Sequence, residues 1–145
     1  MNHKPERIRI YSSEYEKMLD EAIKKAPREA CGLLAGFISE SGGKTVSKVY
    51  ILTNIDQSEE HFSLDQKEQL AAVKNMRLLG IKPLGNWHSH PATPSRPTSE
   101  DIRLAYDKKA IYMILSLAED EPVLKAFHIE NGEVRKEILE IVEGE

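Results

Sequence analysis

Residues 81–91 read IKPLGNWHSHP, a strand-like run that ends in two histidines separated by one residue. Side chains alternate between the faces of a strand, and each residue adds about 3.3 Å, so His88 and His90 share a face and lie close enough to chelate one ion. A helix would turn them to different sides. Pro91 ends the ladder because it has no amide hydrogen to donate. The stretch therefore predicts a strand with a metal-binding pair at its end.

The segment after Pro91 supplies a third candidate ligand. Residues 94–97 have the composition of an irregular loop, and Thr98 to Asp101 form the start of a helix, with a hydroxyl cap and early acids, which we expect to run to about Lys108. With Thr98 at the N-cap, Asp101 lies in the first turn and can fold back over the histidines. Two histidines and one carboxylate form the three-ligand set of catalytic zinc, which leaves the fourth position to water.

Each of these residues also has an ordinary structural interpretation. A single strand histidine is more often a half-buried polar residue, and an acid such as Asp101 is more often a helix cap. The combination favours a metal. Two imidazoles on one strand face are hard to bury in neutral form without a shared partner, and a metal ion is the commonest such partner.

Composition limits the possible classes of protein. The chain has 145 residues, 40% hydrophobic and 30% charged, which predicts one globular domain over residues 1–145. Lys and Arg total 20 against 24 Asp and Glu, with no basic stripe, so we expect no nucleic-acid partner. The longest apolar runs, such as Ala110 to Leu117, fall far short of the roughly 20 residues that span a bilayer, and no signal sequence opens the chain. We therefore expect a soluble, cytoplasmic protein with no membrane partner; the oligomeric state is not indicated.

Strand and helix patterns alternate along the chain, with no repeat and no dividing linker. Helical spacing predicts one helix from a capping box at Ser13–Glu16 to Pro27, and another from Asp65 to Gly80. Turn residues, including Asn131-Gly132, predict two antiparallel hairpins. Apolar patterns predict further strands at 7–11, 31–38, 46–52, 111–117, 123–129 and 134–142. Together these elements predict an α/β fold with a mixed β-sheet flanked by helices, in which 111–117 is a central strand.

The single cysteine, Cys31, rules out an internal disulfide and is expected to be a small buried residue. A nucleophilic thiol, which stays a minor alternative, would need a nearby imidazole. Glu29 lies where a helix ends and an apolar strand begins, which is also a common place for a solvated acid. Trp87 points away from the face of the histidines and is expected in the core. The other histidines, at positions 3, 61 and 128, lack a ligand-spaced partner.

Glu29 precedes the run Cys-Gly-Leu-Leu-Ala-Gly, and His88-Ser-His90-Pro, Thr98 and Asp101 follow in that order. In order and spacing these residues resemble the JAMM motif of the MPN-domain metalloproteases. The order of helices and strands also resembles the MPN fold, a cytidine-deaminase-like α/β fold. The resemblance covers most of the chain.

The resemblance implies a role for each of these residues. His88, His90 and Asp101 correspond to the zinc ligands, and Glu29 corresponds to the general base that acts on a zinc-bound water. The family places a serine where this chain has Thr98, so the hydroxyl that stabilises the oxyanion is assigned to Thr98, with the neighbouring Ser99 in reserve. Zn²⁺ is the implied cofactor.

Members of this family cut peptide or isopeptide bonds after the Gly-Gly tail of ubiquitin or ubiquitin-like proteins, and short prokaryotic members resemble processors of sulfur carriers. The resemblance therefore implies a ubiquitin-like or sulfur-carrier substrate that enters by its C-terminal tail, for which the strand near 46–54 offers an edge. The alternative is a non-catalytic MPN scaffold or a binding module for a sulfur carrier, and such a protein has no need of a base. A zinc deaminase is excluded because its Pro-Cys-x-x-Cys signature is absent.

Overall fold

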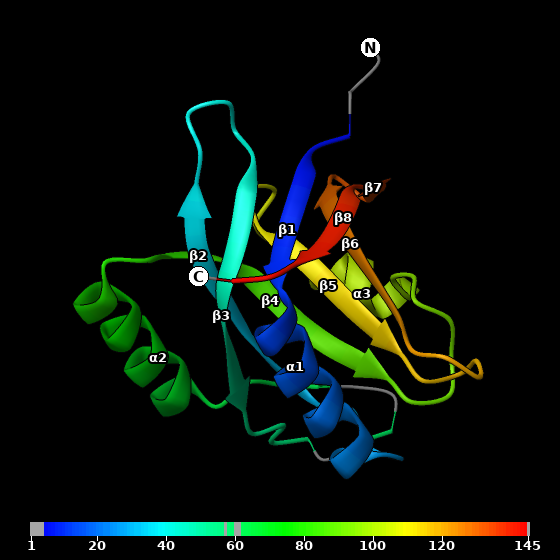
Figure 1. Cartoon of the computed structure of the whole chain (residues 1–145). Helices are drawn as coiled ribbons and strands as arrows, with labels where there is room; N and C mark the ends of the chain where they lie inside the picture. The colour runs from blue at the N-terminus through cyan, green and yellow to red at the C-terminus, as the bar shows by residue number, and fades with distance from the viewer. Residues whose placement is uncertain (1–4, 57, 60–61, 145) are drawn as a thin grey trace.

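The computed structural model describes residues 5–56, 58–59 and 62–144, and its centre is an eight-stranded mixed sheet (Figure 1). The predictions for His3 and His61 lie outside the described residues. The strands follow the order β7-β6-β5-β4-β2-β3-β1-β8 across the sheet. The elements are β1 (Arg7–Tyr11), α1 (Ser12–Lys25), β2 (Cys31–Ile38), β3 (Lys44–Leu52), α2 (Gln66–Leu79), β4 (Lys82–His90), α3 (Ser99–Arg103), β5 (Ile111–Ser116), β6 (Val123–Glu130), β7 (Glu133–Lys136) and β8 (Ile138–Val142).

Strand β4, which carries both histidines, lies in the middle of this sheet. It pairs antiparallel with β2 and parallel with β5, while β1 pairs parallel with β3 and β8. The hairpins β2–β3 and β6–β7 are antiparallel, and the second turns at Asn131 and Gly132, whose φ angles of 52° and 79° suit a two-residue turn. The prediction of a mixed α/β sheet with a buried β5 is confirmed.

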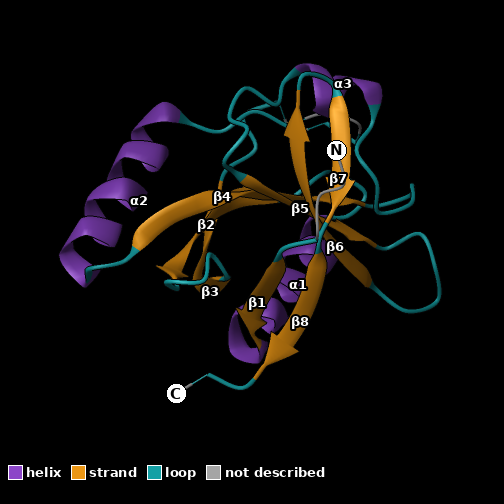
Figure 2. Cartoon of the chain, turned by 90° about the horizontal axis from the view of Figure 1, so that it is seen from above, coloured by secondary structure: helices purple, strands orange, loops and turns teal. Residues whose placement is uncertain are grey.

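The helices cover both faces of the sheet (Figure 2). Helix α1 packs on one face, where Met18 and Ala22 join the larger core with Leu34 and Trp87. Helix α2 packs on the other face through a smaller cluster that includes Met76. Residues on β2 alternate between these two clusters, as the period of a strand requires. No helix in the described part of the chain is long and apolar enough to cross a membrane.

The predicted single strand at 134–142 is wrong, because the segment forms two strands on opposite edges of the sheet. Glu137 separates them. Its N–H donates to the carbonyl of Ala126 on β6, and the N–H of the next residue, Ile138, donates to the carbonyl of Glu6. The chain therefore passes from one sheet edge to the other at Glu137, which brings the two edges together. Residues 134–142 read VRKEILEIV, which contains no glycine, proline or other turn residue to reveal the change of partner.

Two predicted helix boundaries also differ. The capping box at Ser13–Glu16 is wrong: α1 begins at Ser12, and its N-cap residue, Tyr11, makes no side-chain cap bond. Glu14 instead accepts the N–H of Val49 on β3 at 2.7 Å. Helix α3 ends at Arg103 rather than near Lys108. Helix α2 is as predicted, with Asp65 as its N-cap and Gly80 as its C-cap.

The edge of β3 predicted to take an extended tail, over 46–54, has no strand partner beyond Val46 in the described part of the chain. Strand β3 pairs with β2 along its length, and β1 pairs with it over Lys44–Val46. Farther along, the outward amides of Val49 and Thr53 donate to side chains, Glu14 and Glu68 respectively. Helix α1 and helix α2 thus supply acceptors for two amides of this edge, and strand addition there stays a prediction.

Candidate metal centre

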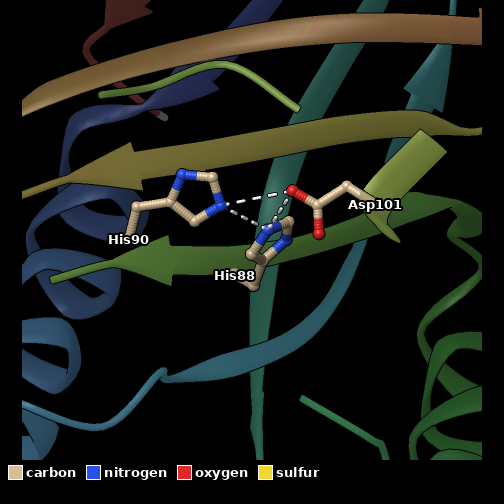
Figure 3. A group of neighbouring side chains, drawn as sticks. All are labelled: His88, His90 and Asp101. Carbon is tan, nitrogen blue, oxygen red and sulfur yellow. Dashed lines mark hydrogen bonds and ion pairs between the residues drawn. The ribbon is translucent and has the colours of Figure 1, made fainter. Parts of the chain in front are cut away.

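The two histidines of β4 point to the same side of the sheet and bring their Nε2 atoms to 3.1 Å of each other (Figure 3). Both are almost completely buried. They hold these positions because β4 is paired on both sides, through Cys31 opposite His88 on β2, and Ile114 and Ser116 beside them on β5. The predicted chelating pair is therefore formed.

Asp101 reaches the pair from the start of α3. Its Oδ2 lies 3.3 Å from Nε2 of His88 and 3.2 Å from Nε2 of His90. A capping box fixes this position: Thr98 Oγ1 accepts the N–H of Asp101 at 3.0 Å, and Asp101 Oδ2 accepts the N–H of Thr98 at 2.9 Å. The helix start thus aims the carboxylate at the histidines, as its spacing from Thr98 predicts.

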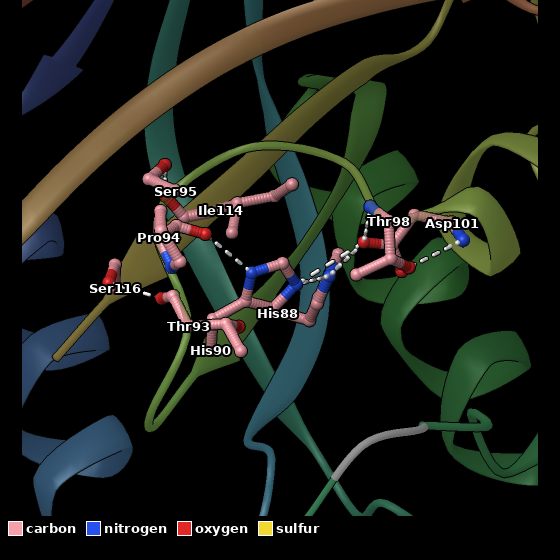
Figure 4. Close-up of polar contacts among 9 residues, drawn as sticks. All are labelled: His88, His90, Thr93, Pro94, Ser95, Thr98, Asp101, Ile114 and Ser116. Carbon is pink, nitrogen blue, oxygen red and sulfur yellow. Dashed lines mark hydrogen bonds and ion pairs between the residues drawn. The ribbon is translucent and has the colours of Figure 1, made fainter. Parts of the chain in front are cut away.

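The loop between β4 and α3 is tied to β5 by two serines (Figure 4). Ser95 Oγ donates to the carbonyl of Ile114, and Ser116 Oγ donates to the carbonyl of Thr93, each at 2.6 Å. Between them, the carbonyl of Pro94 accepts Nδ1–H of His90 at 2.9 Å. This bond assigns a hydrogen to Nδ1 and turns Nε2 towards the centre of the site, which it shares with His88 and Asp101.

The three converging atoms fit a zinc ion. A tetrahedral zinc with bonds of about 2.0–2.1 Å holds its ligand atoms about 3.3 Å apart, which matches the 3.1, 3.3 and 3.2 Å separations among the His88, His90 and Asp101 atoms. The Nδ1 of His88 is buried and has no hydrogen-bond partner among the described residues. Its other ring nitrogen, Nε2, is the one that faces the site.

Burial and mutual contact shift the pKa of all three groups. Burial lowers the pKa of His88 from its ordinary value, against the opposing pull of Asp101. Burial also acts to lower the pKa of His90, but its hydrogen bonds to Asp101 and to the Pro94 carbonyl outweigh this and raise it. For Asp101, burial acts to raise the pKa, but the two histidines hold it well below its usual range. The carboxylate is thus kept ionised, in the state that binds a cation.

Glu29 lies two residues before β2 and is buried, with 5% of its surface exposed, rather than a solvated acid at a strand edge. The next residue, Ala30, bonds to Ser89 between the two histidines, which brings Glu29 near the site, and the negative charge of Glu29 acts to raise the pKa of His90. Its backbone is held from both directions. The Glu29 N–H donates to the Ser58 carbonyl at 2.8 Å, and the next amide, of Ala30, donates to Ser89 Oγ at 2.8 Å.

Two further side chains line the same face. The Phe62 ring stacks on His88 with centroids 4.5 Å apart. Cys31 lies beside His88 on the neighbouring strand. Burial, together with the charge of Glu29, raises the pKa of Cys31 to about 12, so its thiol is protonated at neutral pH, which argues against the thiolate nucleophile. Trp87 lies in the core as predicted and donates to the Tyr50 carbonyl.

Three residues near the site were not predicted: Phe62, Ser89 and Asn54, whose amide binds the Glu29 carbonyl. Ser89 was detectable, because it lies between the two histidines. The other two come from a loop whose place over the site depends on the fold and has no local sequence signal.

Close packing explains why a glycine, Gly32, follows Cys31. A Cβ built at this position would lie 1.7 Å from the Tyr50 carbonyl oxygen and 2.6 Å from Nε1 of Trp87. Only glycine leaves room for the indole to cross β2 and reach β3. The packing of the strand behind the histidines therefore requires this residue.

Thr98 is better placed than Ser99 to act at the site. The Thr98 hydroxyl oxygen binds the amide of Asp101, whose carboxylate faces both histidines. Ser99 is the first residue of α3, and no hydrogen bond of its side chain is among those found in the described part of the chain.

The chain matches a family model, described as prokaryotic homologs of the JAB domain, over residues 12–130. It is 32% identical over 127 residues to the CysO-cysteine peptidase of Mycobacterium tuberculosis, covering 87% of this chain and 85% of that one. It is 25% identical over 107 residues to the desampylase of Pyrococcus furiosus, with 74% of this chain and 73% of that one covered.

Solved structures show the same fold. Protein DSY2949 from Desulfitobacterium hafniense is 48% identical, with a TM-score of 0.87 and 94% of each chain covered. The JAB1/MPN domain protein AF2198 from Archaeoglobus fulgidus is 22% identical, with a TM-score of 0.59 over 93% of this chain and 99% of that one. The fold predicted from the motif and the order of elements is thereby confirmed, and the chain belongs to the family of prokaryotic JAB domains.

Proposed function

We propose that this protein is a zinc-dependent peptidase that hydrolyses the bond after the C-terminal Gly-Gly of a ubiquitin-like or sulfur-carrier protein. One observation carries the proposal: three atoms able to bind a metal converge at 3.1–3.3 Å, and a buried glutamate precedes the residue that bonds to Ser89 between the two histidines. In this proposal, His88, His90 and Asp101 hold the ion. When bound, zinc lowers the pKa of a coordinated water to about 7 and polarises a carbonyl.

Glu29 is the general base in this scheme. Its carboxylate accepts the proton of the attacking water and returns it to the leaving amine when the scissile C–N bond breaks. Burial beside the histidines shields this carboxylate from bulk water, which strengthens its interaction with nearby charge. The fixed backbone of Glu29 and Ala30 keeps the carboxylate aimed at one place.

Thr98 stabilises the oxyanion. Its oxygen already accepts the amide of Asp101, and its hydroxyl hydrogen is still able to donate a bond. A donor aimed at the developing negative charge is typically worth a hundredfold or more in rate, as a rough figure. Ser99 stays in reserve for this role.

The names of the relatives support the substrate class. One is a CysO-cysteine peptidase, another a desampylase, and a third, from Thermus thermophilus, a probable TtuB-protein conjugate cleaving protease. The third is 32% identical over 84 residues. The alternative, a non-catalytic scaffold or binding module, gives no reason to bury a glutamate beside three ligand atoms.

The test is cleavage of carrier fusions. Purified protein is incubated with ubiquitin-like and sulfur-carrier proteins that bear an amino acid or peptide after the terminal Gly-Gly, and the products are weighed by mass spectrometry. We expect release at the glycine carboxyl end, loss of cleavage after treatment with a chelator, and recovery on adding zinc. Intact fusions across the panel, with zinc-loaded protein, would contradict the proposed activity.

A further inference from the structure

We infer that Asn54 is the positioning residue for the general base Glu29; this rests on the proposed function. Asn54 follows β3 by two residues and is buried, with 9% of its surface exposed. Its Nδ2 donates to the backbone carbonyl of Glu29 at 3.1 Å, across 25 residues of sequence.

The remaining bonds of Asn54 fix the direction of its amide. Oδ1 accepts the N–H of Asp56 at 3.0 Å and the N–H of Ser63 at 3.1 Å. Only the oxygen of an asparagine accepts such bonds, so the amino group must face Glu29. Asn54 thus joins both ends of the loop that follows β3 to the residue proposed as base.

This loop holds Glu29 at a second point. The Ser58 carbonyl accepts the Glu29 N–H at 2.8 Å, so both polar groups of the Glu29 backbone bond to the segment that Asn54 organises. Glu29 precedes the first residue of β2 and lies outside the ladder that fixes its neighbours. The contacts from the loop replace the strand bonds that would otherwise set its position.

The metal ligands are held by contacts other than the bond from Asn54 to Glu29. His88 and His90 are set by the pairing of β4, and Asp101 by its capping box with Thr98. Loss of the Asn54 bond is therefore expected to move the base while the ligands stay in place. A shift of about 1 Å in a catalytic group typically lowers the rate by about a hundredfold.

Asn54→Asp isolates this bond. The aspartate keeps an oxygen for the amides of Asp56 and Ser63, but it presents a second oxygen, in place of the amino group, to the Glu29 carbonyl. The matched control is Asn75→Asp on α2. Asn75 accepts the Tyr50 hydroxyl at 2.6 Å through its oxygen, a bond that the aspartate also keeps.

Three measurements test the inference: steady-state kinetics on a cleaved carrier fusion, zinc content, and exchange of the Glu29 amide hydrogen followed by NMR. For Asn54→Asp we expect kcat at least about tenfold lower, KM within about twofold, unchanged zinc, and faster exchange at Glu29. Asn75→Asp should match the unmodified protein in all of these.

An unchanged kcat and unchanged exchange at Glu29 would overturn the inference, as would a loss of zinc that parallels the loss of activity. If the unmodified protein cleaves no fusion, the proposed function fails, and the exchange measurement still decides whether Asn54 holds Glu29. Asn54→Ala removes the bond to Glu29 without an added charge, together with the acceptor for Asp56 and Ser63, and normal kcat in both variants counts against the inference.

Discussion

Two groups of histidine and carboxylate side chains lie close together in the described part of the chain, and they differ in what fills their centre. The first is the candidate metal centre. The second lies next to the N-terminal end of β1, between β6 and the junction of β7 with β8. The second group consists of Glu6, His128 and Glu137. By residue type the two groups look alike.

The second group already contains its own cation. Lys44 Nζ lies 3.2 Å from Nε2 of His128, 3.9 Å from Oε2 of Glu6, and donates to the carbonyl of Lys109. An ammonium has only hydrogens to donate, so Nε2 of His128 accepts, and Nδ1 must carry the hydrogen that bonds Glu137 at 2.5 Å. The ring lone pair of His128 that a metal would need is therefore occupied.

Donor type and proximity are therefore not enough to define a metal centre. In the first group, three possible ligand atoms converge, and the bond from His90 Nδ1–H to the Pro94 carbonyl leaves Nε2 to face the site. In the second, the same kinds of side chain bond one another and Lys44. We interpret the second group as a cluster that stabilises the fold where the two edges of the sheet meet.

The largest predicted difference between the groups is in zinc binding. His88→Ala removes one of three ligands, so we expect zinc affinity to fall by more than about a hundredfold, whereas His128→Ala should keep about one zinc per chain. Elemental analysis of both purified variants checks this. Zinc that stays with His88→Ala and leaves with His128→Ala would reverse the assignment.

The next prediction concerns rate within the first group. Thr98→Val removes the proposed oxyanion donor, so we expect kcat to fall about a hundredfold, with about 1 kcal/mol lost from the α3 cap. Thr98→Ser keeps the hydroxyl and should stay within a few-fold of the unmodified protein. Normal kinetics of the valine variant would transfer the role to another donor, and Ser99→Ala would then be the variant to measure.

The third prediction concerns stability in the second group. His128→Ala leaves Glu137 buried without its partner, and breaking such a buried pair typically costs about 3–5 kcal/mol of unfolding free energy. Urea unfolding of the zinc-loaded variant measures the loss. A change in unfolding free energy below about 1 kcal/mol would show that the cluster does not stabilise the sheet.

The smallest predicted effect is on the reactivity of Cys31. With its pKa raised to about 12, the thiol is protonated at every pH below that value, so at pH 8 only about one molecule in ten thousand carries the reactive thiolate. We expect slow alkylation by iodoacetamide, with a rate that rises as pH rises, and full retention of activity in Cys31→Ala. Rapid alkylation at pH 7, measured by mass spectrometry, would contradict this burial.

The sequence predicted the parts of the site that depend on local spacing. The pairing of His88 with His90 needs only the period of a strand, and the aim of Asp101 needs only a helix cap at Thr98. The same cap pattern failed at Ser13, because Glu14 binds β3 instead. A contact between distant segments decided that outcome.

The features that the sequence did not predict all depend on such distant contacts. Strands β7 and β8 separate at Glu137 because its neighbours bond to β6 and to the residue before β1. Asn54 approaches Glu29 across 25 residues, and Phe62 reaches His88 from the same loop. No periodicity or capping rule encodes these pairings, since each requires the completed sheet.

The most direct test of the central claim is Glu29→Gln, measured for zinc and for cleavage in one preparation. The amide keeps the shape of the carboxylate but cannot accept the proton, and Glu29 is not among the three converging ligands. We predict about one zinc per chain and cleavage of the carrier fusion reduced by at least about a hundredfold. Cleavage at the normal rate by the zinc-loaded variant would contradict the account.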